Sequence, residues 1–409
     1  MRTILIALVC VLSASPAAAQ AVTYTGFIEG RATGYPQEAP NDTTRGVFEG
    51  LFRNEVVLRP ALWFQFAAGL DLRANSHDQV EDEWRLDFED RGLLRPRASV
   101  HRLAATLTAG GFTLDLGKQF IRWGRADVIY PTDRFAPRDY LNVVEPEFLP
   151  VIGVRASFQV GSETFEGIWV PELTPSRLPL LDQRWAVVPP QAAGLTIADG
   201  GGTVPDGAQF GVRWRHTGSR LETALSFFDG FNHHPDLEAR LRPDTSAVDV
   251  VRIFPEVRMF GGDIAIPTTV LTLKAEAAYV TSPTETSDDY LLYVVEIERQ
   301  AGEWLLDVGY AGEVVREART ALVFAPDRRM AKSIIGRASY TFDPRRAVVF
   351  EGAVRQNGDG YYGKIEYSQS MREHWRMTLT GVGIGGDEQD FLGQYHRNSH
   401  GSITLRYSF

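Results

Sequence analysis

Apolar and polar residues alternate along almost the whole chain, in short segments that follow one another from end to end. In residues 61–73, one face carries Leu62, Phe64, Phe66, Ala68, Leu70 and Leu72, and the other carries Gln65, Asp71 and Arg73. Because successive side chains of a β-strand point to opposite faces, such a segment predicts a strand with one apolar and one polar face. About 18 segments of this kind can be read, at residues 22–34, 47–58, 61–73, 95–108, 112–123, 151–160, 163–171, 209–217, 220–229, 249–263, 270–280, 290–299, 303–315, 333–342, 346–355, 361–370, 374–384 and 397–409.

Short and long connections alternate between these segments. The short ones lie at residues 59–60, 110–111, 161–162, 218–219, 301–302, 343–345 and 371–373, and the long ones include 35–46, 74–92, 124–149, 172–208, 230–246, 316–331 and 385–396. Tilted strands of about 9–11 residues cross a bilayer, and membrane barrels have short turns on one side and long loops on the other. The sequence therefore predicts an all-β fold, a transmembrane antiparallel β-barrel of about 18 strands, with about 16 as the alternative, short periplasmic turns and long extracellular loops.

Aromatic residues gather at both ends of the predicted strands. Beside the short connections, on the apolar face, lie Tyr24, Phe112, Phe158, Trp214, Trp304, Phe342, Trp375, Tyr407 and Phe409, and near the long ones lie Trp169, Tyr279, Tyr310 and Tyr361. Two aromatic belts around an apolar band are what a bilayer requires of a barrel exterior.

Two segments depart from regular alternation. In residues 97–107 the apolar face switches after His101, which predicts a β-bulge. Lys118 falls on the apolar face of its strand, so we expect either a change of register there or an ammonium group that reaches the polar interface.

Both ends of the sequence indicate export. Residues 1–19 contain one arginine, an apolar run and a small-residue end, which predicts a signal peptide. Cys10 lies within it, so residues 20–409, expected to form one barrel domain, have no disulfide or cysteine-based site. The last strand ends at Phe409 and resembles the terminal strand of bacterial outer-membrane barrels; the resemblance implies recognition by the barrel-assembly machinery.

The polar faces of the predicted strands carry charges of both signs. A polar interior in a barrel of 16 or more strands leaves room for an aqueous channel, although the charges could also simply pair across strands. The whole chain has a net charge of −10, which disfavours nucleic acid as a partner. The predicted pore-lining residues are Arg31, Asp71, Arg73, Arg155, Arg213, Glu276, Arg337, Glu351, Arg355 and Arg406.

The connection after residues 112–123 combines aromatic, proline and charged residues. It begins with G-K-Q-F-I-R-W-G at residues 117–124, followed by Pro131-Thr132-Asp133. This motif resembles that of porin-like outer-membrane barrels and, more distantly, of alginate-export barrels, and the resemblance implies a channel.

Residues 124–149 form the third long loop, which in general porins folds into the barrel and narrows it. We expect the same here, the alternative being a loop that lies flat over the mouth. The predicted constriction residues are Asp127, Asp133, Arg134, Arg138, Asp139, Glu145 and Glu147.

Residues 172–208 form a long apolar loop, in which Leu178, Leu180, Leu181, Trp185, Val187 and Val188 lie among prolines. An apolar segment of this kind has to be buried, so we expect it to line or to cap the upper pore. Such a vestibule would suit partly apolar solutes.

Motifs for catalysis or metal binding do not emerge from the sequence. His233 and His234 lack a third ligand at metal-site spacing, and no nucleophile motif, P-loop or cofactor motif is found. We therefore expect no enzyme, cofactor or metal, but an outer-membrane channel for passive or facilitated passage of small polar or amphipathic solutes. Its expected partners are membrane lipid and lipopolysaccharide, and it could form a homotrimer. The alternative is an export duct that works with periplasmic and inner-membrane partners.

Overall fold

The computed structural model describes residues 22–187, 195–242, 247–285, 287–319 and 326–409. The predicted signal peptide, residues 1–19, and Val188 of the apolar loop lie outside the described residues. Within the described part, no helix is long and apolar enough to cross a membrane.

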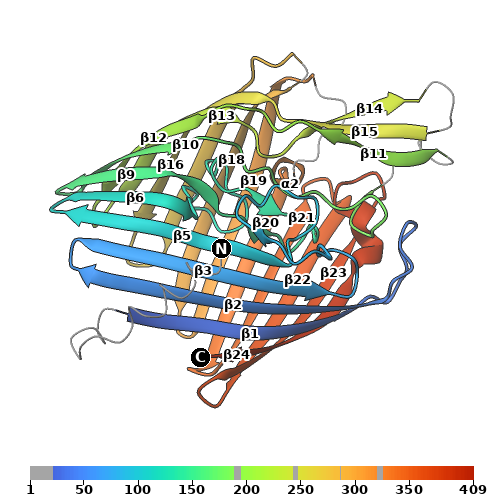
Figure 1. Cartoon of the computed structure of the whole chain (residues 1–409), viewed down its shortest axis with the longest axis horizontal. Helices are drawn as coiled ribbons and strands as arrows, with labels where there is room; N and C mark the ends of the chain where they lie inside the picture. Colours follow the sequence, from blue (N-terminus) through green and yellow to red (C-terminus); the bar gives the residue numbers. More distant parts are fainter. Residues whose placement is uncertain (1–21, 188–194, 243–246, 286, 320–325) are drawn as a thin grey trace, which may run out of the picture.

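Eighteen strands form a closed antiparallel barrel, in which each strand pairs with the next one along the chain and the last pairs with the first (Figure 1). This confirms the predicted all-β fold and the count of 18 rather than 16. The strands are β1 (Val22–Gly34), β2 (Gly46–Ala61), β3 (Phe64–Asn75), β5 (Ala98–Ala109), β6 (Phe112–Gln119), β9 (Val151–Val160), β10 (Glu163–Val170), β12 (Gln209–Thr217), β13 (Glu222–Phe231), β16 (Glu256–Pro267), β17 (Thr272–Thr281), β18 (Asp289–Ala301), β19 (Trp304–Glu317), β20 (Ser333–Asp343), β21 (Arg346–Arg355), β22 (Gly360–Met371), β23 (Trp375–Gly386) and β24 (His400–Ser408).

The long connections carry further short elements. These are β4 (Leu86–Asp87), β7 (Arg138–Asp139), β8 (Glu147–Phe148), α2 (Pro326–Arg329), η4 (Gly393–Asn398), and the three-stranded sheet of β11 (Thr196–Gly202), β15 (Ala247–Ile253) and β14 (Asp236–Leu241). This small sheet projects beyond the barrel end that carries the long loops (Figure 1). At the other end, tight turns such as those at Gly110, Gly161 and Gly302 have φ of 58° to 60°, a conformation that glycine adopts without strain.

The outer face of the barrel is apolar, as the alternation predicts. Phe158 and Phe165 face each other across β9 and β10, and they are 49% and 50% exposed. Of the predicted aromatic belts, the residues with exposed side chains are Tyr24, Phe112, Phe158, Trp304, Phe342, Trp375 and Phe409 near the tight turns, and Trp169 and Tyr361 near the long loops. A face of this composition is suited to lipid, not to water.

One predicted strand is wrong. Residues 249–263 form two strands, because β15 pairs in the small outer sheet and only β16, which begins at Glu256, belongs to the barrel. Pro255 lies between them and lacks the N–H group that a continuous ladder would require. The strand predicted at 112–123 also ends early, at Gln119, where the chain leaves the barrel wall.

The two irregular segments have different outcomes. The bulge at His101 is confirmed, since Gly69 pairs with Arg102 and Leu70 with Val100. Of the two expectations for Lys118, the change of register is wrong, because the ladder runs through Lys118 without a shift. Lys118 lies at the loop end of β6, and its side chain is 3% exposed. Its Nζ donates to Asp90 Oδ2 at 2.7 Å, so a loop carboxylate supplies the partner that a buried ammonium group needs.

Candidate channel constriction

The connection between β6 and β9, residues 120–150 and here named loop L3, enters the interior of the barrel at its first residues. Trp123 and Phe135 pack edge to face at 5.3 Å, and Phe135 packs in the same way on Phe228 of β13 at 5.0 Å. Trp123 Nε1 also donates to Glu166 of β10 at 2.6 Å. Aromatic side chains therefore attach the beginning of L3 to the inner wall, and the segment can be followed inside the barrel in Figure 1.

Asp133 fixes the first turn of L3. Its Oδ1 accepts hydrogen bonds from the backbone N–H groups of Trp123 and Gly124, at 2.5 and 2.6 Å, and its side chain is 1% exposed. A Cβ at Gly124 would lie 2.8 Å from the Cβ of Tyr130, so this turn leaves no room for a larger residue. Asp133 was predicted as a constriction residue, and the structure places it in the framework of the loop.

The middle of L3 is attached to β16 and β17. Glu276 of β17 is 2% exposed and accepts hydrogen bonds from the N–H groups of Arg125, Ala126 and Thr132, at 2.7 to 3.0 Å, and from the Thr132 hydroxyl. The Arg125 guanidinium donates to Asp263 of β16 at 2.6 Å. Glu276 was predicted as pore-lining, and here it points inward and holds the loop.

The last part of L3 is attached to the opposite side of the barrel. Glu145 pairs with Arg31 of β1, and its Oε2 lies 3.7 Å from His400 Nε2 of β24. Glu147 pairs with Arg73 of β3 at 2.7 Å. L3 thus forms hydrogen bonds and ion pairs with β16 and β17 at one wall and with β1 and β3 at the other, where it also approaches β24, so it crosses the interior.

Electrostatics strengthen this second attachment. Burial alone would raise the pKa of Glu145, but the neighbouring His400 and Arg31 outweigh it and lower that pKa to about 2. The charge of Arg73 similarly lowers the pKa of Glu147. Both carboxylates are therefore ionised, and their ion pairs are formed, at neutral pH.

A buried ion-pair network joins L3 to loops L2 (residues 76–97) and L4 (residues 171–208). Asp139 of L3 accepts from Arg95 at 2.9 Å and from Arg177 at 3.2 Å. Arg177 donates in turn to Asp90 at 3.0 Å, and Asp90 also accepts from Lys118. Asp139, predicted as a constriction residue, is 2% exposed and binds neighbouring loops together.

L4 lies against the other long loops at the same end of the barrel. Trp185 is 2% exposed and packs on Tyr395 at 5.6 Å, and the Arg184 guanidinium lies 3.6 Å from the centre of the Tyr35 ring. Asn41 donates to backbone carbonyls of L4, among them Gln183 at 2.7 Å. Polar contacts and Trp185 therefore hold this segment, which the sequence presented mainly as apolar. Of its predicted apolar residues, Leu178, Leu180 and Leu181 are half-buried and Val187 is exposed.

His233 and His234, considered above as metal ligands, are buried packing residues. The Nδ1 of His233 lies 2.9 Å from the Ser176 hydroxyl, and the ring of His234 packs on Tyr140 at 5.2 Å. Burial lowers the pKa of both imidazoles well below 6.5, so they are neutral at pH 7.

A cavity of about 240 Å³ remains between L3 and the wall formed by β21 and β22. L3 contributes aromatic rings and charges of both signs, and the wall contributes a carboxylate, an ammonium group and a phenol. The Arg138 guanidinium lies over two of these rings, 5.0 Å from the centre of Tyr130 and 4.8 Å from that of Phe148. The lining includes Asp127, Tyr130, Arg138, Glu145, Phe148, Glu351, Tyr362 and Lys364.

The other predicted pore-lining charges mostly have partners on adjacent strands or loops. Arg337 is exposed and forms no ion pair within the described part of the chain. Arg134, predicted for the constriction, donates to the Pro131 carbonyl at 3.0 Å. The ion pairs are Arg53–Asp71 at 2.6 Å, Arg73–Asp71 at 3.4 Å, Arg155–Glu166 at 2.5 Å, Arg213–Asp263 at 2.6 Å, Glu351–Lys364 at 3.6 Å, Arg355–Asp390 at 2.9 Å and Arg406–Glu29 at 2.6 Å.

Sequence reasoning missed two inward-facing carboxylates of β18. Glu296 and Glu298 lie on the same strand face as Leu292 and Val294, within YLLYVVEIER. Both faces of this strand are apolar near its beginning, so alternation did not mark the two carboxylates as inward. Their spacing of two residues was the one available signal.

Solved structures of known proteins share this architecture. OccAB4 of Acinetobacter baumannii matches with a TM-score of 0.58 and 9% identity, over 95% of this chain and 98% of that one. A BenF-like porin of Pseudomonas fluorescens Pf-5 matches with 0.56 and 10%, over 95% and 97%. OccK2 (OpdF) of Pseudomonas aeruginosa, solved in complex with glucuronate, matches with 0.52 and 10%, over 95% of both chains.

Comparison of sequences adds no relative. No protein-family model matches the chain, and no curated protein matches it. In fold, and over nearly its whole length, the chain is similar to the bacterial outer-membrane porins.

Proposed function

We propose that this protein is a porin-like channel of the outer membrane, through which small polar or amphipathic solutes pass passively or by facilitated diffusion. The observation that carries the proposal is the path of L3, which joins Glu276 on one wall to Arg31 and Arg73 on the other. A closed barrel with an apolar exterior and a charged interior, narrowed by one bonded loop, has the parts of a selective pore.

Location and partners follow from the same proposal. The chain reaches the outer membrane after removal of its signal peptide, and its outer surface contacts lipid and lipopolysaccharide. The barrel-assembly machinery recognises β24 through Phe409, and the barrel could associate as a homotrimer. It acts without catalysis and takes no nucleic acid.

The cavity beside L3 supports a solute that has both charge and apolar surface. Arg138 and Lys364 offer cationic groups, Glu145 and Glu351 offer carboxylates, and the ring of Phe148 offers an apolar face. A carboxylated sugar of the kind bound by OccK2, glucuronate, would find hydrogen-bond donors in such a site. The export duct has less support, because the similar structures include a porin and L3 is bonded to the wall at many points.

The direct test is single-channel conductance in a planar bilayer, with the refolded protein and a variant whose residues 124–149 are replaced by a short Gly–Ser linker. We expect steady conductance in the wild type and a larger one in the variant, because the linker removes the attachments at Glu276 and Glu147. As a control, a linker replaces residues 237–252, in the outer sheet, and conductance should be unchanged. Absence of conductance in both the wild type and the 124–149 variant would contradict the channel. Absence of conductance in the wild type alone would favour a gated duct.

A further inference from the structure

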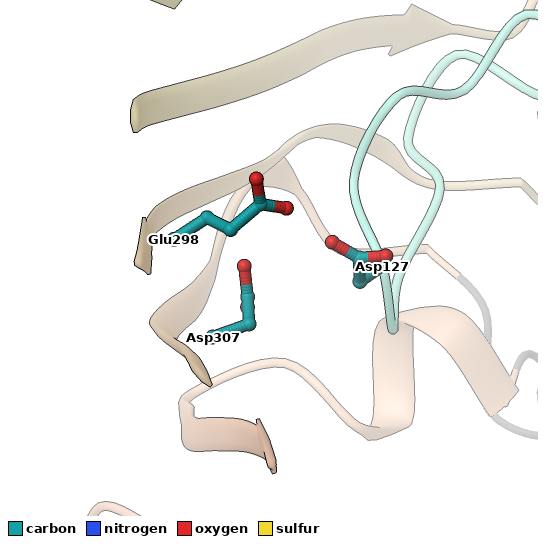
Figure 2. A group of neighbouring side chains, drawn as sticks. All are labelled: Asp127, Glu298 and Asp307. Carbon is teal, nitrogen blue, oxygen red and sulfur yellow. The ribbon is translucent and has the colours of Figure 1, made fainter. Parts of the chain in front are cut away.

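Three carboxylates converge where L3 meets β18 and β19. Asp127 comes from L3, Glu298 from β18 and Asp307 from β19, and one oxygen of each lies within 4.8 Å of the other two. Figure 2 shows the three groups pointing toward one another across the gap between loop and wall. A fourth carboxylate, Glu296, accepts the N–H of Asp127 at 3.2 Å and so lies directly beside them.

The ammonium group of Lys274 lies beside this cluster. Lys274 Nζ lies 2.9 Å from Asp127 Oδ2 and 2.6 Å from Glu298 Oε2, but 3.8 Å from Asp307 Oδ2. Arg337 is the cross-strand neighbour of Asp307, yet no ion pair joins them among the described residues. Lys274 therefore neutralises part of the negative charge and makes its short contacts with only two of the four carboxylates.

The buried oxygens of the cluster supply an independent observation. The Asp307 side chain is 6% exposed, and neither of its oxygens has a hydrogen-bond partner within the described part of the protein. Glu296 is fully buried, and its Oε2 is likewise without a partner there. Carboxylate oxygens that are removed from water and receive no donor are strongly unfavourable in the ionised form, and either a proton or a cation bound beside them relieves this cost.

We propose that Asp127, Glu298 and Asp307 form a binding site for a divalent cation, calcium, with Glu296 as a neighbouring carboxylate. The donors are all oxygens, which hard cations prefer. Calcium binds oxygens at about 2.3–2.6 Å, so ligands on opposite sides of the ion lie about 4.6–5.2 Å apart, whereas about 4.2 Å is the limit for magnesium. The three carboxylate oxygens lie within 4.8 Å of one another, which is inside the span of a calcium coordination sphere. Magnesium demands near-ideal octahedral geometry and loses its water reluctantly, so we expect it to bind this set more weakly.

The site does not depend on the proposed transport function, but it has a consequence for it. Because Asp127 belongs to L3 and its partners belong to the wall, a bound ion joins the loop to the barrel. It also cancels negative charge that faces the lumen, where Asp127 and Glu298 are each 30% exposed. Calcium therefore stabilises the position of L3 and makes the pore less selective for cations.

The test uses the mature chain, refolded from inclusion bodies in detergent so that lipopolysaccharide is absent, and freed of metal with a chelator. Calorimetric titration with calcium chloride should show saturable binding, with magnesium weaker, and calcium should raise the unfolding temperature. D307N and D127N should each weaken binding about tenfold or more, because each removes a charged ligand. K274Q should tighten it, because the competing ammonium group is lost.

Two controls place the ion. E388Q removes an exposed carboxylate of an acidic loop, and E366Q removes one on β22, and both should bind calcium as the wild type does. Absence of saturable binding in the wild type, or unchanged binding in both D307N and D127N, would overturn the proposal. A protein that binds calcium but does not conduct would support the calcium site and contradict the channel. A protein that conducts but does not bind calcium would support the channel and contradict the calcium site.

Discussion

Glu276 receives four hydrogen bonds from L3, and three of them come from backbone N–H groups. We expect Glu276→Ala to lower the free energy of unfolding by about 3 kcal/mol or more, because several buried donors lose a charged acceptor. It should also raise single-channel conductance as the loop detaches. Guanidinium unfolding followed by tryptophan fluorescence measures the first effect.

Glu276→Gln is the matched control, since its amide oxygen still accepts part of this set. It should lose less stability than the alanine variant and keep a conductance nearer to that of the wild type. Equal losses in both variants would show that the charge alone matters, and no loss in either would contradict the anchoring role of Glu276.

Glu145 gives L3 a dependence on pH. Its pKa falls from 4.5 to about 2 in the folded protein, so its pair with Arg31 contributes full stability above about pH 4.5. That contribution is lost as the pH falls from 4.5 through about 2. As the pH falls through this range, L3 should become less firmly held. We therefore expect both the conductance and its noise to rise in bilayer recordings.

Glu145→Gln tests the assignment, because a neutral side chain cannot lose a proton. The variant should resemble the acidified wild type already at pH 7 and respond less to acid. A smaller response will remain, since the pKa values of Glu147 and Asp139 are also lowered. A variant with the full acid response of the wild type would exclude Glu145 as the responsible group.

At the level of elements, the buried network joins L2, L3 and L4 through Asp90, Arg177 and Asp139. We expect Asp90→Ala to destabilise the loop end by about 3–5 kcal/mol, because it leaves Lys118 and Arg177 as buried cations with a partner removed. Proteolysis of the loops should accelerate while the barrel itself remains intact in gel mobility.

Arg91→Gln is the control in two of these loops, L2 and L4. Arg91 pairs with Glu172, whose side chain is 56% exposed, so its loss should cost about 1 kcal/mol or less. If both variants are equally resistant to protease, the network does not hold the loops together.

The strands could be predicted from the sequence, whereas the contacts that the loops make could not. Alternation located the wall because its period is local, and a bulge at His101 could be recognised from a single switch of face. The pairing of Lys118 with Asp90, or of Glu276 with Arg125, depends on segments 28 and 151 residues apart. Pro255 was a local signal for the end of β15, and it was overlooked because alternation continues on both sides of it.

For the whole molecule, closure of the barrel depends on its two ends. Phe409 and Gly26 exchange backbone hydrogen bonds at 3.0 and 3.1 Å, and the Phe409 ring lies 5.6 Å from that of Tyr24. We expect deletion of Phe409 to reduce assembly in cells strongly and refolding in detergent only slightly, if its main role is recognition. Heat-modifiable gel mobility measures both.

Phe342→Ala is the control, because Phe342 is an exposed aromatic of the same belt, at 51% exposure, and lies away from the closing strands. It should assemble in cells nearly as the wild type does. An equal defect of both variants in cells would assign the effect to the aromatic belt, not to the terminal strand.

The path of L3 also has a mechanical consequence. A barrel of 18 strands is easily deformed by lateral pressure, because its wall is one layer thick and a barrel of this size encloses a wide lumen. L3 crosses the lumen and connects its two walls, with Glu276 at one end and Arg31 and Arg73 at the other. The segment that narrows the passage thus also braces the wall, and any change that releases it should make the barrel easier to deform.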